Sequence, residues 1–257
     1  MSTRALAHRF LRAFLIVGAG VAAIIGASAI GPTAGVVAFT LIVLGLFAFV
    51  ALLPRAAHRA FERGDFPRAA RFYRVLRPFV VDPGVRGALD VSLAGCRLAG
   101  SDWRGALAEL EQVSGEALQP SARAAWLNNR AYANARGPID AAAALRDAEA
   151  AMALRPDVAG FRHTRGIALL ALGRTDDAIH ELDTVWRKLA HEDLPPLLEA
   201  ERCFDLGQAW LKKGEADYAR DYFQRARAVA PLSPWARAAG EAMGRLPAER
   251  VGQADAV

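Results

Sequence analysis

The chain has 257 residues, of which 53% are hydrophobic and 23% charged, with a net charge of +5 and a mean hydropathy of +0.14. This length and apolar content exclude a disordered chain. Two cysteines and five scattered histidines exclude a disulfide framework and a metal motif such as HExxH, so we expect neither a metal nor a cofactor. A positive mean hydropathy beside so many charges indicates that the apolar residues are concentrated in one segment.

That segment lies within the first 53 residues. Residues 1–12 carry three arginines and no acidic residue, and the 41 positions from Ala13 to Leu53 carry no charge at all. A turn at Gly31–Gly35 divides the apolar stretch into residues 11–30 and 36–53, and each run can cross about 30 Å of hydrocarbon at about 1.5 Å per residue. We therefore predict a basic N-terminus over residues 1–12 and two transmembrane helices within residues 13–53.

Arginines flank this predicted hairpin on both sides. Arg55, Arg59 and Arg63 follow the second run, so the positive-inside rule places both termini in the cytoplasm, and these side chains are suited to contact lipid headgroups. Abundant alanine and arginine are typical of a GC-rich bacterial genome. We therefore expect a multi-pass protein of a bacterial inner membrane.

One alternative for the first run remains open. It also fits a cleaved signal peptide with Ala27-Ser28-Ala29 as the cleavage site, which would leave one span and the same cytoplasmic C-terminal part. Two buried helices of a soluble protein are disfavoured, because such helices usually carry a polar face.

The glycines of the first run allow two interpretations. Leu15–Ala23 matches a dinucleotide-binding fingerprint, but that site requires an acidic residue about 20 positions later and none occurs before Glu62. Gly18, Ala22 and Gly26 repeat every four residues, which gives a small-residue face suited to packing against another membrane helix. We prefer this packing role.

The remaining charge argues against nucleic acid as a partner. Residues 54–77 carry seven arginines and two acidic residues. Together with the three arginines of residues 1–12, this segment holds more net positive charge than the whole chain carries. The rest has a net charge of −3. A phosphate-binding surface would need its basic residues on the folded domain.

A repeated helical pattern follows the hairpin. Its clearest copy, Glu199–Pro231, has apolar and small residues at helical spacing on either side of a turn glycine. The positions are Cys203, Leu206, Gly207, Trp210, Gly214, Ala219, Phe223, Ala226 and Pro231. This pattern resembles the tetratricopeptide repeat (TPR) family, whose units are antiparallel helix pairs.

Weaker copies occur upstream. Turn glycines at positions 64, 100, 137, 173 and 214 are separated by 36 to 41 residues, against 34 for an ideal unit, so we predict five helix pairs with short insertions. The predicted fold is all-α: the hairpin, a solenoid over residues 54–231 and a capping helix with a tail over residues 232–257. Pro54 is expected to kink the junction with the membrane helix, and Ser233 with Pro234 to begin the capping helix.

The resemblance implies a concave groove, lined by the first helix of each pair, that takes peptides or partner helices. By repeat register, the groove residues of the strongest copies are Asn128, Tyr132, His163, Ile167, Phe204, Gln208 and Lys212. An equally open interpretation makes Tyr132 and Ile167 core residues and Asn128 a solvated one. The basic residues of the TPR subclass that clamps a carboxylate are missing apart from Lys212, so that partner is not expected.

Catalysis has little support in the sequence. His163 lacks a nucleophile or acid in its column, and Cys203 occupies a buried repeat position. We expect a membrane-anchored scaffold, not an enzyme, that recruits or assembles protein partners at the membrane. The alternative is an accessory subunit of a membrane complex, held mainly through its hairpin.

Overall fold

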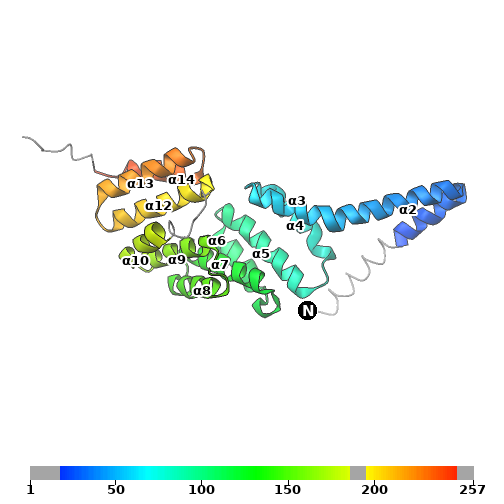
Figure 1. The fold of residues 1–257 in the computed structure, drawn as a ribbon, viewed down its shortest axis with the longest axis horizontal. Helices are drawn as coiled ribbons and strands as arrows, with labels where there is room; N and C mark the ends of the chain where they lie inside the picture. The colour runs from blue at the N-terminus through cyan, green and yellow to red at the C-terminus, as the bar shows by residue number, and fades with distance from the viewer. Residues whose placement is uncertain (1–17, 186–194, 248–257) are drawn as a thin grey trace, which may run out of the picture. The chain divides into compact units, whose positions relative to one another are not determined.

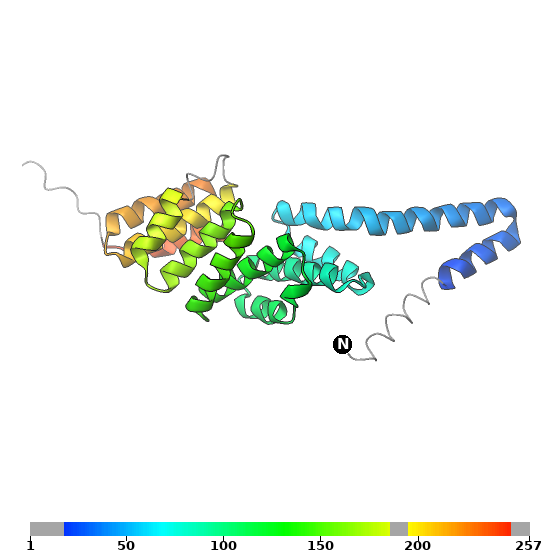
Figure 2. The same ribbon diagram turned by 60° about the horizontal axis from the view of Figure 1, so that its bottom comes forward.

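The computed structural model describes residues 18–185 and 195–247, and in these residues it contains helices and no strand. The basic N-terminus, the start of the first apolar run (11–17) and the tail from residue 248 lie outside the described residues. The chain forms two compact units, Met1–Gln119 (unit 1) and Pro120–Val257 (unit 2). Figures 1 and 2 show the fold in two views.

The N-terminal part of unit 1 is a pair of helices. Residues 18–30 are helical, Gly31 interrupts the helix, and α2 (Pro32–Phe47) begins at once with proline in its first turn. The second helix therefore starts four residues before the predicted run 36–53, because proline fits the first turn of a helix, where a backbone donor has no partner. In the described residues, no single helix combines the length and the apolar character needed to cross a membrane.

The junction between α2 and the helix pairs is a π turn. The helix continues in the same direction from α2 through η1 (Ala48–Leu52) into α3 (Leu53–Glu62), as Figure 1 shows. The backbone N–H of Leu53 donates to Ala48 O, five residues earlier. Such a turn takes up an irregularity in the backbone hydrogen bonds, and here it stands immediately before Pro54, where the sequence predicts a kink.

Two helix pairs complete unit 1, and the helices of each pair pack against each other. The first is α3 with α4 (Phe66–Leu76), the second is α5 (Pro83–Ala99) with α6 (Trp103–Glu111), and the 3-10 turns η2 (Arg77–Phe79) and η3 (Gly115–Ala117) follow α4 and α6. Asp65, Asp82 and Asp102 cap α4, α5 and α6, since each carboxylate accepts from the N–H three residues further on.

Unit 2 contains three further pairs and a last helix. The elements are α7 (Pro120–Arg136), α8 (Ala141–Leu154), α9 (Ala159–Ala171), α10 (Thr175–Ile179), η4 (His180–Val185), α12 (Pro196–Lys212), α13 (Ala216–Val229) and α14 (Pro234–Met243). Ser233 caps α14 and Pro234 is its first residue, as the sequence predicts. The described residues thus contain the five predicted helix pairs.

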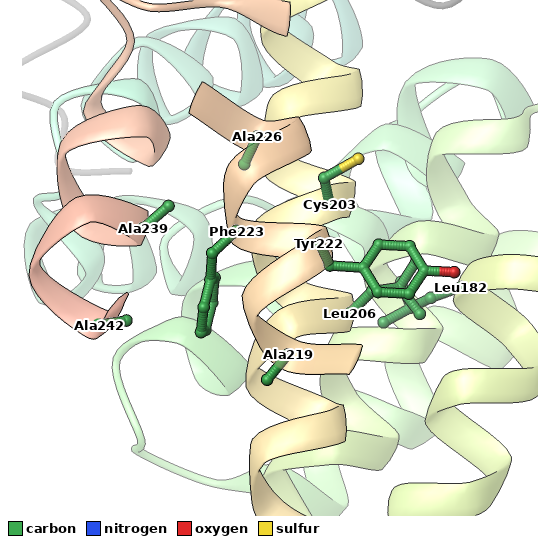
Figure 3. Packing of buried hydrophobic residues seen from close by; sticks show 9 residues of the cluster. All are labelled: Leu182, Cys203, Leu206, Ala219, Tyr222, Phe223, Ala226, Ala239 and Ala242. Carbon is green, nitrogen blue, oxygen red and sulfur yellow. The ribbon is translucent and has the colours of Figure 1, made fainter. Parts of the chain in front are cut away.

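Helices approach closely where the repeat pattern has small residues. A Cβ added to Gly207 of α12 would lie 2.5 Å from the ring of Phe223 of α13, and one on Gly166 of α9 would lie 2.6 Å from Leu182. Figure 3 shows the buried side chains around Phe223, contributed by α12, α13, α14 and Leu182. Any side chain at these two glycines would push the helices apart.

The five predicted turn glycines all lie in turns between paired helices. Gly64, Gly173 and Gly214 adopt the left-handed conformation that glycine tolerates best. In the second pair, however, the left-handed residue is Ser101, with φ 61°, whereas Gly100 has φ −89°. Gly137 does not have a positive φ either. Gly100 and Gly137 therefore occupy their turns without the left-handed conformation.

We predict that Ser101→Gly stabilises the protein. A side chain in the left-handed region costs about 1–2 kcal/mol, and glycine avoids this cost at the expense of a more flexible unfolded chain. The expected gain is about 0.5–1 kcal/mol, measured by urea unfolding followed by tryptophan fluorescence. Gly214→Ser is the reciprocal control and should destabilise by a similar amount. A lower midpoint for Ser101→Gly would contradict the strain at this turn.

Candidate partner-binding surface

The seven predicted groove residues lie in unit 2 on the first helices of its three pairs. Asn128 and Tyr132 are on α7, His163 and Ile167 on α9, and the other three, Phe204, Gln208 and Lys212, on α12. His163 and Ile167 are buried, at 2% and 4% exposure, so their side chains offer almost no surface to a partner.

Internal contacts engage most of the other predicted groove residues. The ring of Phe204 lies 5.6 Å from that of Trp235 in α14, and the Tyr132 hydroxyl donates to Glu201. Lys212 Nζ donates to Leu170 O at 3.0 Å although its side chain is exposed.

Asn128 and Gln208 are different. Both are partly exposed, and within the described part of the chain neither side chain forms an internal hydrogen bond. The amide oxygen of Asn128 is itself buried and has no partner there. A buried acceptor without a hydrogen bond is uncommon in proteins, and this oxygen can reach a donor of a bound molecule once the partly exposed side chain turns outward.

A buried charged cluster explains why so little of the groove is free. Arg136 of α7 donates to both oxygens of Asp205, at 2.6 Å each, and to Glu201 Oε1 at 2.7 Å. His163 Nε2 lies 2.9 Å from Asp205 Oδ2, and the Arg136 guanidinium lies 4.6 Å from the ring centre of Trp235. We call these residues, with Tyr132, the Arg136 cluster. It connects α7, α9, α12 and α14.

Burial and charge act in opposite directions on the cluster. Burial alone would lower the pKa of Arg136, but the negative charges of Asp205 and Glu201 raise it well above its ordinary value. Burial would raise the pKa of Asp205, and Arg136 and His163 together lower it. Burial raises the pKa of Tyr132 well above 10.0, so its hydroxyl stays protonated and remains a donor. Arg136 and Asp205 therefore retain their charges at neutral pH.

Part of the cluster resembles a metal-ligand set. Ligand atoms of His163, Glu201 and Asp205 lie within 4.8 Å of one another. Both Asp205 oxygens already accept from Arg136, so a metal ion would have to displace a buried guanidinium. The arrangement fits an ion-pair cluster better than a metal centre.

Unit 1 has a cavity of about 700 Å³ between α4, α5 and α6, which sequence reasoning did not identify. Ion pairs line it: Arg77 with Asp90, and Arg97 Nη2 with Glu109 Oε1 at 2.9 Å. When the second and fifth pairs are aligned by sequence, Asp90 and Arg97 stand where the fifth has Cys203 and Trp210. Charged side chains at these apolar positions could have revealed the cavity.

The two cysteines are poor nucleophiles. Cys96 and Cys203 are buried, and burial raises the pKa of their thiols to about 11 and about 12. Only the thiolate attacks efficiently, and neither thiol ionises appreciably near neutral pH.

The residues predicted to pack against another membrane helix are exposed. Gly18, Ala22 and Gly26 all lie at the surface, and a Cβ added to Gly18 or Gly26 would meet no atom within 4 Å. The two N-terminal helices instead approach at Gly35, where an added Cβ would clash with Ser28. The Gly18, Ala22 and Gly26 face therefore points away from the chain's own second helix.

The topology arginines Arg55, Arg59 and Arg63 are exposed as well. Arg55 Nη1 folds back onto Ala51 O at 2.6 Å. No carboxylate pairs with any of the three within the described residues. Their charges are thus uncompensated by direct ion pairs.

Comparison with solved structures identifies the fold. The TPR protein TTC0263 of Thermus thermophilus is similar with a TM-score of 0.53 at 19% identity, over 74% of this chain and 97% of its own. YrrB, described as a TPR protein with an unusual peptide-binding site, has a TM-score of 0.42 at 15% identity, over 74% of this chain and 90% of its own. No family model matches the chain, and no curated protein matches it. The fold is an all-α, TPR-type arrangement of helix pairs.

We predict that Arg136→Ala destabilises the protein by about 3–5 kcal/mol, because it leaves Glu201 and Asp205 buried without their counter-charge. Urea unfolding measures the change. Arg225→Ala is the matched control: its pair with Asp221 is half-exposed, so its loss should cost less than about 1 kcal/mol. Equal effects of the two substitutions would show that the cluster does not stabilise unit 2.

We also predict that Cys96 and Cys203 resist alkylation in the folded protein. With pKa values of about 11 and about 12, on the order of one thiol in a thousand or fewer is ionised at pH 8. Mass spectrometry after iodoacetamide treatment should show slow labelling that accelerates as the pH rises toward 11, and rapid labelling in urea. Rapid labelling of either cysteine at pH 8 without urea would contradict their burial.

Proposed function

We propose that this protein is a membrane-anchored scaffold whose helix pairs bind a protein partner. One observation carries the proposal of a binding surface. The partly exposed side chain of Asn128, whose amide oxygen has no internal partner, lies at a groove position from which a TPR-type asparagine can bond to the backbone of an extended peptide. Gln208, partly exposed and free of internal hydrogen bonds, is the second predicted contact.

The anchor is proposed on separate grounds. The 41 positions without charge form the most apolar part of the chain, and α2 exposes large apolar side chains along its length, among them Phe39, Leu41, Leu44 and Phe47. Exposed apolar surface of this extent is typical of a membrane or protein contact. The three exposed arginines after it favour an inner-membrane hairpin with both termini in the cytoplasm.

Binding, not catalysis, is the proposed mode of action. The Asp205 carboxylate that faces His163 is engaged by Arg136, and both cysteines have raised pKa values. The chemistry of these groups supports structure and recognition.

A second candidate function is that of an accessory subunit held through its hairpin. The exposed Gly18, Ala22 and Gly26 face supports it, since small residues allow another membrane helix to approach closely. The two functions differ in where the partner touches the chain.

Site-specific photocrosslinking in native membranes separates them. A photoreactive residue replaces Gln208 in one version of the full chain and Ala22 in another. The scaffold predicts discrete protein adducts from position 208 that are reduced several-fold by Asn128→Ala. Gln224→Ala, which removes an exposed amide from α13, is the matched control and should leave the adducts unchanged.

Adducts from position 22 alone would favour the accessory subunit. Adducts from position 208 that do not respond to Asn128→Ala would contradict the assigned contact.

A further inference from the structure

The connection between α4 and α5 exposes an unusual number of apolar side chains. Val81 is 80% exposed and Phe79 49%, and Val75 and Val85 on either side are about half-exposed. Single exposed apolar residues are ordinary, but four within eleven positions form a patch that water solvates poorly. We call residues 77–82 the interfacial loop.

The interfacial loop is held in one conformation by polar contacts. The Arg86 guanidinium donates to Val80 O at 3.1 Å and to Val81 O at 3.4 Å. Asp82 caps α5 by accepting from Val85 N at 2.8 Å. These bonds fix the backbone while the side chains of Phe79 and Val81 remain outside, so their exposure is built into the loop.

An aromatic contact places the interfacial loop beside η1, at the C-terminal end of the apolar helix that begins with α2. The rings of Phe79 and Phe49 meet edge to face, with centroids 4.9 Å apart. Phe49 follows Pro32 by 17 residues, which at about 1.5 Å per residue places it about 26 Å along the helix. This is close to the thickness of a hydrocarbon core, about 30 Å. In Figures 1 and 2 the connection from α4 to α5 turns on the side of unit 1 from which α2 extends.

Basic residues lie close to this loop in the sequence. Arg74 is in the last turn of α4 and Arg77 begins η2, and both also line the cavity of unit 1; Arg55 follows η1. Arg77 is paired with Asp90, whereas the guanidinium of Arg74 has no carboxylate partner within residues 18–185 and 195–247. Asp82 is engaged in its cap. Apolar side chains flanked by arginine match the boundary of an anionic bilayer, where headgroup charge lies next to hydrocarbon.

We propose that the interfacial loop is a second membrane contact. Phe79 and Val81 insert at the headgroup level of an anionic lipid surface beside the anchor helix, and Arg55 and Arg74 bind its headgroups. The proposal rests on the membrane anchor of the proposed function. Its consequence is that the first helix pairs are held against the bilayer by two contacts instead of swinging on one helix.

Spin-label accessibility tests the loop in the full chain. Val81→Cys carries the label in vesicles of equimolar phosphatidylcholine and phosphatidylglycerol, and collision rates with oxygen and with a water-soluble nickel chelate are compared. Leu44→Cys reports the anchor, and Leu232→Cys, 99% exposed in unit 2, reports water. The buried native cysteines are expected to stay unlabelled.

The interfacial loop predicts an oxygen preference at position 81 that is several-fold above that at position 232 and below that at position 44. It also predicts that the preference falls when phosphatidylglycerol is replaced by phosphatidylcholine. Equal values at positions 81 and 232, with position 44 in lipid, would overturn the loop contact and leave the anchor intact. Equal values at positions 44 and 232 would overturn the anchor itself.

Protection of position 81 from both reagents, in vesicles and in detergent alike, would indicate a protein covering the loop and would also overturn the lipid contact. A second variant uses a label at Val85 with Val81→Asp, which should reduce the oxygen preference at position 85 several-fold. Val229→Asp is the matched control: it replaces an exposed valine in unit 2 and should leave the oxygen preference at position 85 unchanged. No change with Val81→Asp would contradict insertion of the loop.

Discussion

Close approach of paired helices through small residues is the constraint on which both units depend. The second helix of each pair carries an alanine at the same repeat position, and all five alanines have no exposed surface: Ala69, Ala106, Ala144, Ala178 and Ala219. In two pairs a glycine on the first helix lies directly against a large side chain of the second. A larger residue at any of these places would separate the helices and open the core on which every pair relies.

The Arg136 cluster determines how much of the first-helix surface of unit 2 remains for a partner. It takes up Tyr132 and His163, while Phe204 packs on Trp235 beside it. A cluster with two buried carboxylates and one buried arginine makes these helices hold a defined geometry, since each group depends on the others for its hydrogen bonds. The proposed binding surface is therefore narrower than the TPR resemblance implies, and Asn128 and Gln208 are its open positions.

Local patterns in the sequence predicted the fold well. The helix pairs and the cap at Ser233 follow from residue spacing and from the chemistry of helix ends, which act over a few positions. The left-handed conformation of Ser101 could not be predicted, because glycine is the more usual left-handed residue and φ is set by the packing of the whole turn.

The candidate site was less predictable. The bonds from Arg136 to Glu201 and Asp205 join residues 65 and 69 positions apart, and spacing within one helix carries no information about such pairs. The direction of the Gly18, Ala22 and Gly26 face was likewise undetermined, because a small-residue repeat does not specify which helix it contacts.

The account of how this protein meets a membrane rests on the proposed anchor. Its most direct test is a pair of reporters fused in turn after Val257, a fluorescent protein that folds in the cytoplasm and a phosphatase that is active only outside it. A hairpin with both termini inside predicts fluorescence and no phosphatase activity, and an active phosphatase without fluorescence would contradict it.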